Sequence, residues 1–166
     1  MKDKLDNDGI AYNTEITERG LLEEAHNLNI AKTVIPKFKL PQGFIVEYGS
    51  WRGSVIDELS RRYGVHRVFG FEIGNFFGHL QIHDFDVRHL AGNRQYQRPI
   101  ALAWNDLSDW NGSPMGKQAA FDHALNNLVD GGIYIEHRKC PDYILSHPNL
   151  TLIDETKHLL FFRFND

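Results

Sequence analysis

The order of apolar and polar residues along the chain predicts a sheet whose strands are mostly separated by helices. Short apolar runs that end on a polar residue are typical of strands, whereas apolar residues at every third or fourth position are typical of helices. We expect strands at residues 44–47, 67–72, 79–85, 99–106, 133–136, 150–155 and 158–164. Longer helices are expected over residues 55–63 and 117–129, and over a segment that reaches residue 30 and for which Thr14 and Thr17 are alternative N-caps. Residues 1–13 are polar and are expected to form a loose arm.

The stretch Phe44–Ser54 has the pattern of a strand, a glycine turn and the start of a helix. Glu47 closes the strand, and Gly49 and Gly53 lie in the turn. Such a turn brings backbone N–H groups and a helix N-terminus close to a ligand, and glycine lets the backbone approach it. Glu72 ends the next strand 19 positions after Gly53, which is the separation at which nucleotide-binding folds place a carboxylate on ribose hydroxyls. Two carboxylates are therefore expected to flank one turn.

These residues resemble motif I, and the acidic strand end that follows it, in class I S-adenosylmethionine-dependent methyltransferases. The family pattern is an apolar strand, an acid, one residue and then Gly-x-Gly-x-Gly. This chain keeps Glu47, Gly49 and Gly53 but carries Trp51 at the middle glycine. A replaced middle glycine is similar to the branch of macrocin O-methyltransferases and cephalosporin hydroxylase-like proteins. A second resemblance is the run Leu-Val-Asp-Gly-Gly at residues 128–132, which precedes the fifth strand.

The resemblance implies one domain over residues 1–166 with an α/β fold. The expected architecture is a three-layer, Rossmann-like, mostly parallel seven-stranded sheet that ends in a C-terminal antiparallel hairpin. The hairpin is also predicted by the two apolar runs at 150–155 and 158–164, which only a few polar residues separate.

The resemblance further implies that the cofactor is S-adenosyl-L-methionine. Glu47 is expected to order the turn or to meet the methionine amino group, and Glu72 to hold the ribose. Asp86 is expected at the exocyclic amino group of the adenine, with Asp84 as the alternative register. The expected cofactor-binding residues are Glu47, Gly49, Ser50, Trp51, Gly53, Glu72, Ile73, Asp86 and Asn105.

Two further strand ends carry polar residues that are candidates for chemistry. Ligands of open parallel sheets bind outside the carboxyl ends of the strands, so Asn105 and Asp106 are expected to face the same crevice as the two glutamates. In metal-dependent sugar O-methyltransferases of the resembled branch, acids at the fourth and fifth strand ends hold a divalent cation such as Mg²⁺. Asp106 and Glu136 are the matching residues here, although His137 stands where a second acid is expected.

A proton transfer without metal is the alternative at this edge. The unperturbed pKa of histidine, about 6.5, suits His137 to remove a hydroxyl proton at neutral pH. Asp106 and His137 are therefore the expected catalytic residues. Glu136 would then be free to pair with Arg138 or Lys139 at the surface. Residues 107–116, which include Trp110 and several turn formers, are expected to form either a flap over the substrate or a plain connector.

Composition narrows the classes of partner. The chain has 166 residues and a formal net charge of −4, which argues against a general binder of nucleic acid or of membrane surfaces. A single cysteine, Cys140, cannot form an internal disulfide, so a reducing cytoplasm is expected. The sequence contains no apolar run long enough to span a bilayer, and its charged start does not resemble a secretory signal.

Three functions are compatible with these features. The first is an S-adenosylmethionine-dependent methyltransferase that acts on a hydroxyl of a small molecule or sugar. The second is a module of the same fold that binds a cofactor or partner without turnover. The third is a dinucleotide-dependent oxidoreductase domain, which is disfavoured because the glycines do not follow Gly-x-Gly-x-x-Gly. Since the chain is nearly all core fold, we expect a small acceptor or a site that a second copy of the chain completes.

Overall fold

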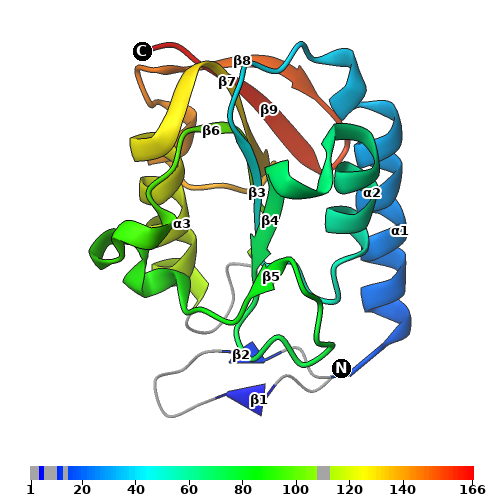
Figure 1. The fold of residues 1–166 in the computed structure, drawn as a ribbon. Helices are drawn as coiled ribbons and strands as arrows, with labels where there is room; N and C mark the ends of the chain where they lie inside the picture. The colour runs from blue at the N-terminus through cyan, green and yellow to red at the C-terminus, as the bar shows by residue number, and fades with distance from the viewer. Residues whose placement is uncertain (1–3, 6–10, 13–14, 108–112) are drawn as a thin grey trace.

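A computed structural model describes residues 4–5, 11–12, 15–107 and 113–166, and its centre is a seven-stranded sheet (Figure 1). The strands are β3 (Phe44–Tyr48), β4 (Val68–Phe71), β5 (Ile82–His83), β6 (Ile100–Asn105), β7 (Leu128–His137), β8 (Leu150–Glu155) and β9 (Leu159–Phe164). Their order across the sheet is β5-β4-β3-β6-β7-β9-β8. The five neighbouring strands β5, β4, β3, β6 and β7 pair in parallel. Strand β9 lies between β7 and β8 and runs antiparallel to both. The predicted mostly parallel sheet with a C-terminal hairpin is confirmed.

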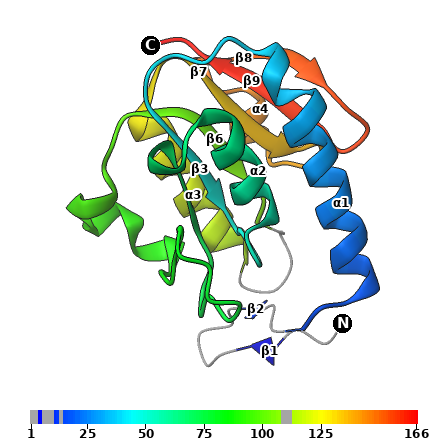
Figure 2. The ribbon, with the colours of Figure 1, turned by 45° about the vertical axis from the view of Figure 1, so that its right-hand side comes forward.

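Helices cover both faces of this sheet, which gives three layers (Figures 1 and 2). On one face, α1 (Glu18–Thr33) packs beside α2 (Ser54–Tyr63). The opposite face is covered by α3 (Ser113–Asn127), with the short α4 (Asp142–Leu145) nearby. Short 3₁₀ helices occur at η1 (Ile35–Lys37), η2 (Val65–Arg67), η3 (Val87–Gly92) and η4 (Arg94–Tyr96). Within the described ranges, no helix combines the length and the apolar character needed to cross a bilayer.

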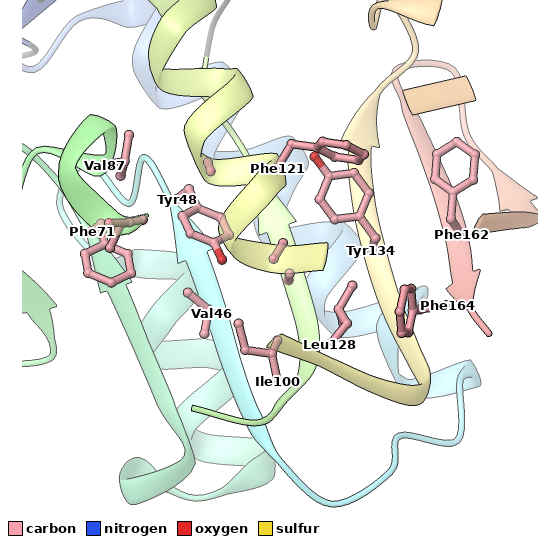
Figure 3. Packing of buried hydrophobic residues seen from close by; sticks show 14 of the residues in the cluster. Val46, Tyr48, Phe71, Val87, Ile100, Phe121, Leu128, Tyr134, Phe162 and Phe164 are labelled. Atoms are coloured by element: carbon pink, nitrogen blue, oxygen red, sulfur yellow. The ribbon is translucent and has the colours of Figure 1, made fainter. Parts of the chain in front are cut away.

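Alternation along the strands divides the buried side chains into two cores. Tyr48 and Tyr134 lie in the core under α3, and the Tyr134 ring packs against Phe121 of that helix (Figure 3). Ile45 and Trp104 belong to the core under α1 and α2. Successive residues of a strand point to opposite faces, so neighbours in sequence serve different layers. The same rule decides below which strand-end residues share a site.

The ends of three elements differ from the sequence-based expectation or refine it. The side chain of Thr17 accepts a hydrogen bond from the N–H of Gly20, so Thr17 is the N-cap of α1. Helix α3 ends at Asn127 and β7 begins at once, two residues before the expected end of the helix. Strand β5 has two residues because the Asn75 amide bonds the carbonyls of His79 and Ile82, which holds the preceding residues in a loop.

Part of the expected N-terminal arm is paired. Strands β1 (Lys4–Leu5) and β2 (Ala11–Tyr12) form a two-stranded antiparallel ladder. Residues 108–112, which include Trp110 and most of the expected flap or connector, lie outside the described residues.

Candidate functional site

The turn between β3 and α2 passes close to the end of β6. Gly49 has a φ of +84°, and a Cβ at this position would lie 3.0 Å from Cδ2 of Leu107 and 3.2 Å from the carbonyl oxygen of Asp106. Gly53 has a φ of +91° and precedes the first residue of α2, and a Cβ there would collide with the ring of His79. Both glycines are therefore required by conformation and by close approach. The turn and the end of β6 form one edge of the site.

Trp51 keeps the backbone conformation that a middle glycine would have. Its φ is +48°, in the left-handed region that is uncommon for a large side chain. The indole packs against Gly20 of α1, where a Cβ would lie 2.9 Å from Cη2 of the ring, and against the edge of Phe77. The N–H of Trp51 donates to Oε2 of Glu72 over 2.9 Å. The tryptophan in the glycine motif therefore fits because residue 20 of α1, against which its ring packs, is a glycine.

The two glutamates at the strand ends lie in an environment that disfavours their charge. Glu47 is 2% exposed, and no described residue forms a hydrogen bond with its Oε1. Burial raises its pKa well above the usual range, and the negative charge of Asp106 adds to the shift. Burial also raises the pKa of Glu72 to about 7, against the opposing effect of the Trp51 N–H. Carboxyl groups perturbed in this way are frequent at functional sites.

The two expected catalytic residues, Asp106 and His137, are in contact. Oδ1 of Asp106 lies 3.2 Å from Nε2 of His137, and its Oδ2 accepts a hydrogen bond from Nδ2 of Asn27 at 3.1 Å. Burial acts to lower the pKa of His137, but the hydrogen bond and charge of Asp106 outweigh it and raise the pKa overall. Sequence reasoning missed Asn27 because nothing in the pattern of α1 distinguishes it from a solvent-facing residue.

A second histidine, His26 of α1, lies beside the Asp106–His137 pair. The ring of His26 meets that of His158 edge-on with centroids 5.1 Å apart, and Nε2 of His26 is buried without a partner in the part of the chain that the structure describes. Burial lowers the pKa of His26, and the nearby charges of His158 and His137 act in the same direction. The His26 ring on α1 therefore lies near both Asp106 and His137 and contacts His158, which is in the turn before β9.

Asn105 and Glu136 do not belong to this group, because they point to the opposite face of the sheet. Asn105 is fully buried, and its Nδ2 donates to the Lys117 carbonyl at 3.2 Å and to the Tyr134 hydroxyl at 3.0 Å. Glu136 is also fully buried, and its Oε1 lies 2.7 Å from Nζ of Lys117. Asn105 is therefore not placed at the cofactor crevice as expected.

The expected metal pair is separated for the same reason. Asp106 faces α1 and His137, whereas the Glu136 carboxylate is ion-paired with Lys117 beneath α3. The alternative expectation, a surface pair with Arg138 or Lys139, is also wrong for Glu136. Among the described residues, no group of three or more histidine, cysteine, aspartate or glutamate side chains is arranged to hold a metal ion.

Three other residues that were expected to bind the cofactor form hydrogen bonds within the protein instead. Ser50 is buried, and its Oγ donates to the carbonyl of Glu47 and lies where a side chain on Gly70 would be. Asp86 caps η3: burial acts to raise its pKa, but hydrogen bonds from Arg88 lower the pKa overall. Asp84, the alternative register, accepts from the N–H of Gly74 at 2.6 Å.

Ile73 follows Glu72 directly and is partly buried, on the loop that Asp84 closes. Ile73, one of the expected cofactor-binding residues, therefore lies beside Glu72. The residues that the structure brings together around the turn are therefore Glu47, Gly49, Trp51, Gly53, Glu72 and Asp106, with Asn27 and His137 at their border.

Solved methyltransferases share this fold. The TDP-rhamnose 3'-O-methyltransferase of calicheamicin biosynthesis is 19% identical, with a TM-score of 0.53 over 90% of this chain and 82% of that enzyme. The N-methyltransferase NodS from Bradyrhizobium japonicum WM9, in complex with S-adenosyl-L-homocysteine, is 12% identical, with a TM-score of 0.57 over 92% of this chain and 90% of that one.

A third similar structure is the magnesium protoporphyrin IX methyltransferase from Synechocystis PCC 6803 with bound S-adenosylmethionine. It is 12% identical, with a TM-score of 0.57 over 92% of this chain and 86% of that enzyme. No protein-family model and no curated protein matches the sequence. At these identities the similarity shows a methyltransferase-like, Rossmann-like fold, and the reaction has to be argued from the site.

Proposed function

We propose that this protein is an S-adenosylmethionine-dependent methyltransferase that methylates a hydroxyl group of a small molecule or sugar. The observation that carries the proposal is Oε1 of Glu47, which is buried without a partner between the glycine turn and Asp106. A buried polar atom without a partner is costly and calls for a ligand or water. S-Adenosylmethionine carries a sulfonium and an ammonium group, and either cation would favour the ionised carboxylate.

The remaining residues of the turn suit the same cofactor. Gly49 and Gly53 keep the backbone free of side chains where the chain approaches β6 and His79. Glu72, at the end of the neighbouring strand, presents a carboxylate for ribose hydroxyls, as the resembled family does at this position. The fold shared with methyltransferases that bind S-adenosylmethionine or S-adenosylhomocysteine supports this assignment.

The pair of Asp106 and His137 supports a hydroxyl as the acceptor. When bound, the cofactor supplies an electrophilic methyl group. With Nε2 of His137 held by Asp106, Nδ1 is the ring nitrogen that takes the proton from the acceptor hydroxyl. A positioned base of this kind contributes roughly 10²–10⁴-fold to the rate. Asn27 fixes the second oxygen of Asp106, and no step involves a divalent cation because Glu136 is committed to Lys117.

Calorimetric titration tests the cofactor assignment directly. S-Adenosylmethionine and S-adenosylhomocysteine are expected to bind with micromolar affinity, and NAD and NADP are expected not to bind. Replacing Glu72 by alanine should weaken binding at least tenfold, about 1.4 kcal/mol. The matched control is Glu23→Ala, which removes an exposed carboxylate on the outer side of α1. Binding of a dinucleotide, or of neither ligand pair, would contradict the proposal.

A module that binds the cofactor without turnover is the second candidate, favoured by the bulky Trp51 at the middle glycine. The two candidates differ in what Asp106→Ala and His137→Ala do in an acceptor screen, which should begin with sugar-containing hydroxyl compounds because of the resemblance to the macrocin branch. Loss of methyl transfer with cofactor affinity retained supports the enzyme. Cofactor binding without turnover of any acceptor by the unmodified protein supports the module.

A further inference from the structure

A closed polar network lies beneath α3, on the face of the sheet opposite to the proposed site. Lys117 is 2% exposed and Glu136 is fully buried, and Nζ of Lys117 lies 2.7 Å from Oε1 of Glu136. The Tyr134 hydroxyl donates to Oε2 of Glu136 at 2.7 Å and accepts from Nδ2 of Asn105 at 3.0 Å. Asn105 in turn donates to the Lys117 carbonyl at 3.2 Å. Four side chains from α3, β6 and β7 are thus bonded in a ring.

This network is attached to the chain on both sides of Asp106. Asn105, immediately before it, is held by its amide. Leu107, immediately after it, is held by its carbonyl, which accepts a hydrogen bond from Nζ of Lys117 at 3.0 Å. Since residues 105 and 107 are both fixed from below the sheet, the direction of the Asp106 side chain above the sheet is fixed with them.

The same network also holds His137. The N–H of His137 donates to Oε1 of Glu136 at 2.8 Å, so one carboxylate oxygen receives both Lys117 and the backbone of the histidine. The ion pair therefore joins the two strand ends that carry Asp106 and His137. Nζ of Lys117 links the Leu107 carbonyl, just after β6, to the Glu136 carboxylate on β7, next to the two residues whose Oδ1 and Nε2 are in contact.

We propose that Lys117 is a positioning residue for the Asp106–His137 pair. Through Glu136 it fixes the two strand ends so that Asp106 holds Nε2 of His137 and Nδ1 remains free to accept a proton. The inference rests on the proposed function for its purpose, because only a proton-accepting His137 needs this orientation. The geometry itself is tested without any turnover.

Two buried tyrosines provide a matched comparison. Tyr48 and Tyr134 are both fully buried on this face, and each hydroxyl makes short hydrogen bonds. The Tyr48 hydroxyl bonds Nδ1 of His123 at 2.7 Å, outside the network, whereas the Tyr134 hydroxyl belongs to it. Removing one oxygen from either ring leaves the apolar packing in place. Tyr134→Phe is therefore the mild test and Tyr48→Phe its control.

The readout is the ¹⁵N spectrum of the His137 imidazole at a pH where the ring is neutral, assigned from the signal that His137→Gln removes. The unmodified protein should show one tautomer, with the proton on Nε2. In Tyr134→Phe the shift difference between the two ring nitrogens should shrink as the second tautomer is populated, and Tyr48→Phe should leave it unchanged. A spectrum that is the same in all three proteins overturns the proposal.

Substitutions of Lys117 itself extend the test. Lys117→Met should shrink the shift difference further than Tyr134→Phe does, and Lys117→Arg, which keeps charge and donors, should restore most of it. Because Lys117→Met leaves Glu136 without its partner, Lys117→Met/Glu136→Gln is the variant to use if the single one does not fold. A folded variant with an unchanged His137 spectrum contradicts the role of Lys117, and Tyr134→Phe keeps the test decisive if neither folds.

These outcomes are separate from those of the cofactor titration. If S-adenosylhomocysteine fails to bind but the His137 tautomer still depends on Tyr134, the proposed function fails and the positioning network stands. If the cofactor binds and the tautomer is independent of the network, only the positioning role fails.

Discussion

The two faces of the sheet treat their buried polar groups differently. Under α3, Lys117, Glu136, Tyr134 and the pair of Tyr48 and His123 are hydrogen-bonded, and Oδ1 of Asn105 is left without a partner. On the face toward α1, the buried polar atoms without partners among the described residues include Oε1 of Glu47 and Nε1 of Trp104, and these two residues are Cα partners in the parallel pairing of β3 and β6.

This difference suggests that the face under α3 supports the structure and that the face toward α1 binds the ligand. The network under α3 is hydrogen-bonded except at Oδ1 of Asn105, and such a network fixes one arrangement of the chain. Buried polar atoms without partners, most of which among the described residues lie on the face toward α1, are costly unless a ligand or water completes them. The face toward α1 also holds Glu72, whose pKa is raised to about 7. We therefore expect substitutions under α3 to act mainly on stability and geometry, and substitutions at the glycine turn and its carboxylates to act mainly on binding.

The largest effect is expected from Lys117→Met. The substitution leaves the Glu136 carboxylate buried without its ion-pair partner, and breaking such a pair typically costs about 3–5 kcal/mol of unfolding free energy. Urea denaturation measures the loss. Lys32→Met, which changes an exposed residue in the last turn of α1, is the control and should stay within about 0.5 kcal/mol. A cost below about 1 kcal/mol for Lys117→Met would remove the contrast between the two faces.

Gly53→Ala should be next in size. Its φ of +91° costs about 1–2 kcal/mol for a residue with a Cβ, and the collision with the His79 ring adds about 1–3 kcal/mol of overpacking. Gly131→Ala is the matched variant, because Gly131 has a φ of +80° and no described atom lies within 4 Å of its Cβ position. The difference between the two unfolding free energies isolates the close approach at the turn. Equal losses would show that the turn needs glycine for its backbone conformation alone.

Much of the fold was predictable because it depends on periodicity. The apolar run of β6, the glycine turn after β3 and the terminal hairpin are local patterns, and they gave the correct layers and the mostly parallel sheet. The length of β5 was not predictable, because it is set by hydrogen bonds of the Asn75 side chain to two later carbonyls. The end of α3 was predicted two residues too late, because Leu128 already pairs with Ile100 of β6 as part of β7.

The site was predictable only in part. Strand ends identified Glu47, Glu72, Asp106 and His137 as neighbours, because parallel strands bring their carboxyl ends to one edge. The rule does not say which face each side chain takes, and one position along β7 separates His137 from Glu136. Glu136 is paired with the long Lys117 side chain on the face under α3. This pairing could not be predicted, because no sequence pattern links a lysine on α3 to the end of β7.

Glu72→Gln is expected to stabilise the protein at high pH. The pKa of Glu72 is raised from its ordinary value of 4.5 to about 7, so between these pH values the folded protein holds a proton that the unfolded chain has lost. Stability due to this group is full below about pH 4.5 and falls as the pH rises through 7.

The size of that effect follows from the shift. A rise of the pKa from 4.5 to about 7 corresponds to a loss of at most about 3–4 kcal/mol of unfolding free energy above pH 7. Thermal unfolding at pH 8 should therefore show a higher Tm for Glu72→Gln than for the unmodified protein, and the difference should vanish near pH 4.5. Glu23→Gln, at an exposed site, should show no such trend. A gain that does not depend on pH would mean that the charge of Glu72 is not its cause.

The smallest effect is expected at the start of α1, the helix that brings Asn27 to Asp106. Thr17→Ala removes the side-chain acceptor for the N–H of Gly20 and should cost about 1 kcal/mol of unfolding free energy. Thr33→Ala makes the same change at the other end of the helix, where the hydroxyl donates to the Asn29 carbonyl and caps no N–H group. Alanine has the higher helix propensity there, so that variant should be neutral or slightly stabilising. If both variants lose the same amount in urea titrations, the N-cap is not what fixes α1, and the contacts of Gly20 with Trp51 and of Asn27 with Asp106 hold the helix over the site.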